Sequence, residues 1–93
     1  MPHKLVVLEE AQTTSLPVTY IDLLVISPIK ELVVFRVTQT SQFFELKRRY
    51  SEICGKPEYK MTLVFRNRVI SPAVTPYLLS MKNRDVLQIR FLD

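Results

Sequence analysis

Stretches rich in apolar and β-branched residues alternate with polar turns over most of the chain, a pattern that predicts several short strands. The first two stretches, residues 20–27 and 32–37, are separated by a break at Pro28, and we expect them to form a hairpin. Three further strands are expected at residues 61–66, 69–70 and 85–92.

One amphipathic helix is predicted between the second and third strands, where apolar residues recur at spacings of 3, 4 and 3. Thr40 or Ser41 can cap its first turn. Gly55, the only glycine in the chain, stands where a helix C-terminus favours positive φ. A shorter helical turn is expected at residues 77–81, capped by Thr75. The apolar face of the main helix consists of Phe43, Leu46, Tyr50 and Ile53.

This order of elements, β-β-α-β-(β)-turn-β, predicts an α+β fold of the β-grasp (ubiquitin-like) type. One main helix is expected to pack on a four- to five-stranded mixed sheet, with the short helical turn before the last strand. The first and last strands would be central neighbours, and the strand at residues 32–37 would be an edge. Residues 1–19 are expected to form a tail or linker, and residues 20–93 the folded domain.

Composition is that of one ordinary globular domain: 93 residues, 47% apolar and 24% charged. No apolar run approaches the ~20 residues of a membrane span. The N-terminus lacks a signal-peptide layout because Glu9 and Glu10 interrupt it. A single cysteine allows no internal disulfide, which fits a reducing compartment. The formal charge of +4 permits contact with nucleic acid or an acidic protein but demands neither.

The residues that enzymes and metal sites use are not grouped in this sequence. Cys54 has no plausible catalytic partner, since the only histidine is His3 in the tail, and we interpret it as a small buried thiol. Metal-ligand clusters, paired catalytic carboxylates and a glycine-rich phosphate loop are also missing. We therefore expect a protein that is not an enzyme and uses no cofactor and no metal.

A set of residues in fixed order and spacing runs through most of the chain. It comprises Tyr20, Ile21, Leu23, Phe35, Val37, Leu46, Lys47, Tyr50, Gly55, Pro57, Phe65, Ile70, Thr75, Pro76, Met81, Asp85 and Val86. Together, over residues 20–92, these positions resemble SUMO. The chain departs from SUMO at its end, where Phe91-Leu92-Asp93 stands without the processed Gly-Gly that forms the isopeptide bond. A modifier with its tail removed remains an alternative to a SUMO-like domain that cannot be conjugated.

Similar SUMO-like domains occur in tandem in the RENi family of genome-stability proteins, and this chain resembles them, with the first of the two domains favoured. The resemblance implies a nuclear protein of DNA repair and recombination that works with the SUMO pathway. Its domain would recruit SUMO-pathway enzymes or SUMO-binding partners without chemistry of its own. The alternative is a nucleic-acid-binding module.

The resemblance also implies a partner-binding groove, because SUMO receives short motifs as a strand added between its second strand and its helix. Here that groove would be less charged, since Ile53 replaces a basic residue and Thr38 a polar or basic one. Phe44, which replaces a charged residue, either extends an apolar patch or packs under the tail or the groove rim. Alternating strand residues must also point into the core. Arg36 and Lys47 keep the positive charge that would receive the acidic end of such a motif. The carried-over positions are Val33, Phe35, Arg36, Val37, Thr38, Leu46, Lys47 and Ile53, to which we add Phe44.

The open sheet face is expected to be basic. SUMO uses acidic residues there to dock the basic back side of its E2 enzyme, whereas the matching positions here are Arg66, Lys82, Asn83 and Arg84. Like charges oppose association, so an E3 ligase or a SUMO-targeted ubiquitin ligase is a better candidate than the E2. The predicted basic face suits an acidic protein or DNA, or is merely solvated. Its members are Arg66, Lys82, Arg84 and Arg90.

One apolar island interrupts the predicted tail: Leu5-Val6-Val7-Leu8-Glu9-Glu10. Aliphatic residues followed by acids are the composition of a SUMO-interacting motif. The island is therefore either an ordinary extra strand or a motif that adds to a SUMO-like edge. That edge would belong to SUMO itself or to residues 32–38 of a neighbouring copy, and the second case would give self-association.

Overall fold

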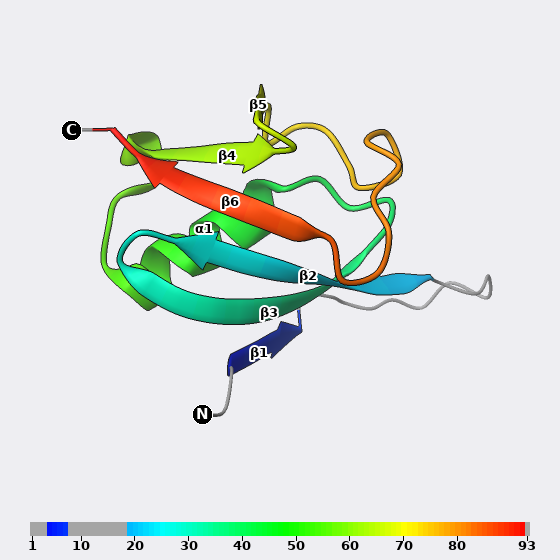
Figure 1. Cartoon of the computed structure of the whole chain (residues 1–93), viewed down its shortest axis with the longest axis horizontal. Coiled ribbons are helices and arrows are strands. Elements are labelled where there is room, and N and C mark those ends of the chain that lie inside the picture. The colour runs from blue at the N-terminus through cyan, green and yellow to red at the C-terminus, as the bar shows by residue number, and fades with distance from the viewer. Residues whose placement is uncertain (1–3, 8–18, 93) are drawn as a thin grey trace.

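The structure, a computed structural model, describes residues 4–7 and 19–92. In this part of the chain, six strands form one mixed sheet in the order β1-β3-β2-β6-β4-β5, with one α-helix packed behind it (Figure 1). The elements are β1 (Lys4–Val7), β2 (Tyr20–Ser27), β3 (Lys30–Thr38), α1 (Phe44–Cys54), the 3₁₀ turn η1 (Glu58–Lys60), β4 (Met61–Phe65), β5 (Arg68–Ile70) and β6 (Val86–Phe91).

The centre of the sheet is the parallel pair β2–β6, in which Leu24 lies opposite Val86. β2 and β3 form the expected antiparallel hairpin, and β4 pairs with both β5 and β6. In Figure 1, β6 (red) runs between β2 and β4. The prediction of a β-grasp fold with its first and last predicted strands as central neighbours is therefore confirmed.

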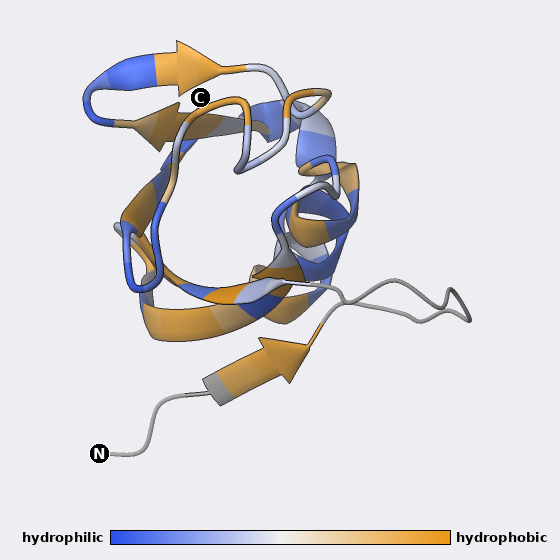
Figure 2. Ribbon diagram, turned by 90° about the vertical axis from the view of Figure 1, so that its right-hand side faces the viewer, coloured by the Kyte–Doolittle hydropathy of each residue, from blue (hydrophilic) through white to orange (hydrophobic). Residues whose placement is uncertain are grey.

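One prediction about the sheet is wrong: β3 is not an edge. Parallel to it, on the side away from β2, lies β1, with Val6 opposite Phe35 (Figure 1). The sheet therefore has one strand more than expected, and that strand comes from the region expected to be a tail. Its sequence, KLVV, is mostly hydrophobic, and most of this strand appears orange in Figure 2.

The core lies between the sheet and α1. Alternation along β2, β3 and β6 sends every second residue inward, while α1 contributes Leu46 and Tyr50, and Phe43 precedes it. The predicted helical face is thus buried, with Ile53 packed partly against it. The inward strand residues include Ile21, Leu23, Val25, Val33, Phe35, Val37, Leu87 and Ile89.

The predicted C-terminal end of α1 is confirmed, whereas the predicted N-terminal cap is wrong. Gly55 has φ 74° and donates its N–H to Ser51 O at 2.9 Å, as a left-handed helix end requires. Neither Thr40 nor Ser41 caps the start, because the chain is held there from outside the helix. The Phe43 N–H donates to Pro72 O at 2.8 Å, which ties the helix start to the loop after β5.

The turn expected before the last strand is present as a series of hydrogen-bonded turns. Leu78 N–H donates to Thr75 Oγ1 at 3.2 Å, so threonine does cap it. The Ser80 N–H donates to Tyr77 O at 3.0 Å, and the Met81 N–H to Pro76 O at 2.9 Å. Within the described residues, no helix has the length and hydropathy of a membrane span.

Candidate functional site

The side of β3 away from β2 is the first candidate surface, and β1 occupies it. Four residues pair in parallel, from Lys4 opposite Val33 to Val7 opposite Arg36. Val6 alone points into the core and is 5% exposed, whereas Leu5 and Val7 are 49% and 55% exposed. β1 is therefore a short docked strand held by backbone pairing and one buried side chain.

The residues of the predicted groove differ in exposure: some are buried, some half-buried and some exposed. Val33, Phe35, Val37 and Leu46 are buried in the core, so they support the fold rather than line an open surface. Phe44 is 52% exposed on α1, consistent with the view that it extends an apolar surface. Arg36 is exposed as well, while the side chains of Thr38, Lys47 and Ile53 are half-buried.

Arg36 faces the open side of the sheet, away from α1, and is matched by Asp22 on β2. Arg36 Nε lies 2.8 Å from Asp22 Oδ1, and Nη2 lies 3.2 Å from Oδ2, a bidentate pair between directly opposed residues. The hydrogen bond from Arg36 lowers the pKa of the Asp22 carboxyl, and the charge of Arg84 lowers it further. The guanidinium expected to receive an acidic motif is thus already paired with an acid.

Lys47 also departs from the expected groove, because it lies on the β4–β5 side of α1. There it borders a shallow hollow of about 410 Å³ that sequence patterns did not indicate. The hollow forms where β5 ends, so that Met61 and Thr62 of β4 have no strand beside them on the side away from β6. Its lining residues are Lys47, Met61, Thr62, Leu63, Val69, Ile70, Ser71 and Pro72.

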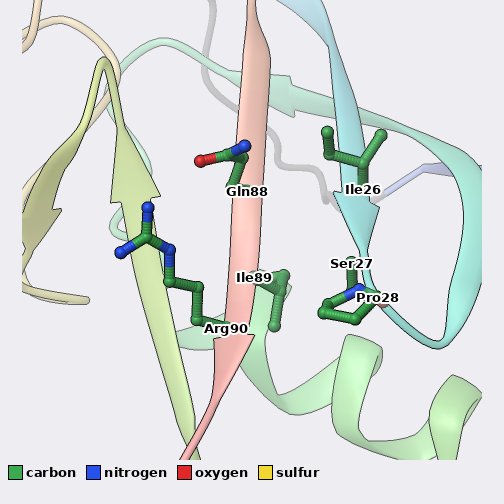
Figure 3. A pocket seen from close by; sticks show the side chains of 6 residues that line it. All are labelled: Ile26, Ser27, Pro28, Gln88, Ile89 and Arg90. Carbon is green, nitrogen blue, oxygen red and sulfur yellow. The ribbon is translucent and has the colours of Figure 1, made fainter.

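A second, smaller hollow of about 180 Å³ opens where β2 turns away from β6 (Figure 3). Ile26, Pro28 and Ile89 give it apolar walls. Figure 3 shows the Arg90 side chain pointing toward β4, on the far side of β6 from Ile26 and Pro28. Charged groups therefore do not converge on this hollow.

The open face carries an apolar row across four strands. Strand register places Leu5, Val34, Leu24 and Val86 side by side on β1, β3, β2 and β6. These four side chains face outward, because the buried residues next to them along the strands point into the core: Val6, Leu23, Val25, Val33, Phe35 and Leu87. The centre of the open face is therefore aliphatic rather than basic.

The four predicted basic residues are all exposed but do not form one cluster. Lys82 and Arg84 precede β6, while Arg90 lies near its other end, about 20 Å of extended strand away. Arg66 lies in the β4–β5 turn, with its guanidinium carbon 4.9 Å from the centroid of the Phe65 ring. Instead of one continuous basic face, the structure has separate basic side chains around an aliphatic centre.

Two of these arginines have unusual backbone conformations. Arg66 and Arg84 have φ values of 53° and 72°, in the left-handed region that non-glycine residues rarely adopt. Arg84 is fixed there because its N–H donates to Asp22 O at 2.6 Å, while the Asp22 N–H donates to Asn83 Oδ1 at 2.7 Å. The loop before β6 is therefore attached to β2 and presents Arg84 in a defined position.

Other predicted features lie partly outside the described residues. Of the apolar island, Leu5, Val6 and Val7 belong to β1, whereas Leu8, Glu9 and Glu10 fall outside. Cys54 is a half-buried free thiol at the end of α1. Among the described residues, no three His, Cys, Asp or Glu side chains are grouped as metal ligands would be.

Comparison with known proteins relates this geometry to a family. The sequence profile described as "Ubiquitin-2 like Rad60 SUMO-like" matches residues 21–91. No curated protein sequence matches the chain. Among solved structures, ubiquitin of Caldiarchaeum subterraneum is similar, with a TM-score of 0.74 at 9% identity over 81% of this chain and 96% of that one. At such low identity the likeness concerns the fold, whereas the profile covers most of the sequence, and the chain thus belongs to the Rad60 SUMO-like family of ubiquitin-like domains.

Proposed function

We propose that this SUMO-like domain is a non-catalytic docking module of a nuclear DNA repair and recombination protein. It recruits SUMO-pathway proteins by accepting one of their segments as an added strand at β3. The observation that carries this proposal is β1 itself, an aliphatic strand docked along β3 with Val6 buried opposite Phe35.

Strand addition gives affinity through main-chain hydrogen bonds and specificity through pockets for alternate side chains. The docking of β1 meets both conditions, since four residues pair and one of them enters the core. A partner segment with an aliphatic residue at the Val6 position offers the same groups. An E3 ligase or a SUMO-targeted ubiquitin ligase suits this role better than the SUMO E2, because Arg66, Lys82 and Arg84 would oppose a basic E2 surface.

Nuclear magnetic resonance can test the strand-accepting edge in the full chain. We expect a peptide with an aliphatic run followed by acids to shift the backbone amide signals of Val33–Val37 and to leave those of β5 unchanged. The physical reason is that an added strand makes its hydrogen bonds with β3 alone. A control peptide with lysine at the central aliphatic position should shift nothing. Shifts confined to β4, β5 and β6 would contradict the proposal.

We further propose that the domain is one of a tandem pair in a RENi-family protein, and we favour the first of the two positions. A fluorescent fusion of the complete protein should concentrate in the nucleus and at sites of induced DNA damage. The reading frame on either side of residues 1 and 93 should encode a second SUMO-like domain. Cytoplasmic fluorescence that persists after damage would oppose the nuclear role.

A second candidate function is DNA binding. Within the described residues the salt bridges involve Arg36, Arg48 and Arg49, while Arg66, Lys82, Arg84 and Arg90 are exposed and form none. Exposed cations that are not held in salt bridges suit phosphate oxygens. DNA would therefore contact the exposed basic residues around the open face rather than its aliphatic centre.

Salt dependence separates DNA binding from peptide docking. If Arg84 and Arg90 contact phosphates, replacing both with alanine should weaken duplex binding and reduce the slope of log affinity against log salt by about 2. Fluorescence anisotropy with a labelled duplex at several salt concentrations measures that slope. Arg48→Ala, on α1 and paired with Glu45, is the matched control and should leave the slope unchanged. An equal slope in all three proteins would count against phosphate contacts by these arginines.

A further inference from the structure

We infer that β1 is an intramolecular competitor for the β3 edge, so that a partner strand binds only after β1 has left. This inference rests on the proposed function, because it concerns the regulation of the same edge. It goes beyond that function in assigning a role to the apolar island of this particular chain. Two features of the structure carry it, the occupied backbone of β3 and the filled side-chain position, together with the short stretch of sequence between β1 and β2.

β1 and β2 together leave no room for a third strand beside residues 33–36 of β3. β2 pairs with one side of β3 from Tyr20 opposite Thr38 to Ser27 opposite Lys30. β1 pairs with the other side over Val33–Arg36. Because a strand has only two hydrogen-bonding sides, a partner segment must replace β1 to pair with these residues.

The side-chain position is filled as well. Val6 is 5% exposed and belongs to the same buried cluster as Phe35, Leu46 and Tyr50. It therefore occupies the site where a partner's anchoring residue would be buried. The rest of β1 is held less firmly, since Leu5 and Val7 are about half exposed. A strand of four residues with one buried anchor can dissociate while the β2–β3 hairpin stays intact.

The tether keeps β1 close to its site. Val7 pairs with Arg36, and Tyr20 pairs with Thr38, so β1 ends and β2 begins near the same end of β3. The two strands flank β3, which separates them by about 10 Å. Twelve residues, 8–19, lie between the two strands in sequence and can span at most roughly 40 Å, which exceeds the separation that the connection must bridge.

A tether of this length gives the docked strand a local concentration in the millimolar range. A partner present at a lower concentration then competes poorly with β1. Its apparent affinity equals its intrinsic affinity multiplied by the fraction of molecules in which β1 is undocked. If about one molecule in ten has β1 undocked, the apparent dissociation constant is about tenfold larger than the intrinsic one. The edge is therefore closed by default and opens to partners that bind strongly or are held nearby.

Val6→Lys in the full chain tests this competition, with Val7→Lys as the matched control. Both variants add the same charge to β1, but only Val6 is buried, so only Val6→Lys should undock the strand. Fluorescence anisotropy with a labelled peptide of residues 2–10 measures binding. We expect Val6→Lys to bind the peptide about tenfold or more tightly than the natural chain, and Val7→Lys to stay within about twofold of it.

A second variant, which we call the lock variant, tests the inference without relying on the folding of Val6→Lys. Cysteines introduced at Leu5 and Val34, which lie opposite each other, can form a disulfide that fixes β1 in place. Cys54→Ala removes the native thiol from this variant. We expect the oxidised protein to lose peptide binding and the reduced protein to regain it. Equal binding in the two redox states would overturn the inference.

The outcomes separate the inference from the function on which it rests. Equal peptide affinity in all folded variants, with the peptide mapped to β3, would overturn the competition and leave the strand-accepting edge standing. No binding by Val6→Lys or by the reduced lock variant, both shown to be folded by circular dichroism, would overturn the strand-accepting edge itself. Tighter binding by Val6→Lys alone, together with loss on oxidation, supports both.

Discussion

Replacing Phe35 with alanine should lower the free energy of unfolding by about 3–5 kcal/mol, the usual loss for a buried phenylalanine. Phe35 is fully buried in β3, faces the Tyr50 ring of α1 at 6.2 Å between centroids, and lies opposite Val6 of β1. Three elements therefore lose contacts at once. Since small domains are stable by only about 5–15 kcal/mol, this one substitution can leave much of the protein unfolded at room temperature.

Urea denaturation followed by circular dichroism measures the effect. Phe44→Ala is the matched control, because it makes the same chemical change at a residue that is 52% exposed on α1. We expect Phe44→Ala to change stability by less than about 1 kcal/mol. If the two variants unfolded at the same urea concentration, the burial that distinguishes Phe35 from Phe44 would be wrong.

Tyr50 should show a comparable loss that divides into two parts. Its ring is buried in the core, and its hydroxyl donates to Ser27 Oγ at 2.7 Å, which attaches α1 to the end of β2. Tyr50→Ala should cost about 3–5 kcal/mol through the lost ring. Tyr50→Phe keeps the ring and removes the hydrogen bond, so it should cost about 1 kcal/mol. The same denaturation experiment yields both values, and equal losses would mean that the ring contributes little.

Tyr50 also makes the free energy of unfolding decrease at alkaline pH. Burial raises the pKa of its phenol above the usual 10.0, although the hydrogen bond with Ser27 opposes the shift. In the unfolded chain the phenol ionises near pH 10, so the unfolded state loses its proton first. The stabilising contribution is therefore complete below pH 10 and declines as pH rises through the folded pKa. Tyr50→Phe should flatten this decline, which thermal unfolding between pH 8 and pH 11 would measure.

Much of the fold could be predicted because its signals are local. Buried residues alternate with more exposed ones along most of β2, β3 and β6, and the helical spacing of Phe43, Leu46 and Tyr50 is regular. Gly55 marked the helix end because only a residue without a side chain takes φ 74° at no cost. The capping of α1 was predicted wrongly because the Phe43 N–H at its start donates to Pro72 O, an acceptor that is distant in sequence.

β1 shows where local patterns stop being informative. Four residues with one buried side chain suggest a strand but cannot name its neighbour. The sequence left open an ordinary extra strand or a strand added to a SUMO-like edge. The structure shows the first alternative, since β1 is an extra strand of this chain's own sheet, and addition to another molecule stays a prediction.

Side-chain roles at the site were harder to predict than the elements that carry them. Arg36 was expected to meet an acidic motif, but register places Asp22 opposite it, and register depends on the pairing of two whole strands. Lys47 is one residue beyond Leu46 on α1, a rotation of about 100° that carries it toward β4 and β5. Both differences follow from three-dimensional pairing rather than from residue type.

The position of β6 has a consequence for how the protein is made. β6 is the last strand of the domain in sequence, yet it lies between β2 and β4, which do not pair with each other. On the ribosome, the β2–β3 hairpin, α1 and the β4–β5 hairpin emerge first, as pieces with no shared sheet. The sheet closes only when Val86–Phe91 leaves the exit tunnel, so folding waits for the final strand to be synthesised. A premature stop that removes this short strand would therefore remove the centre of the sheet rather than its margin.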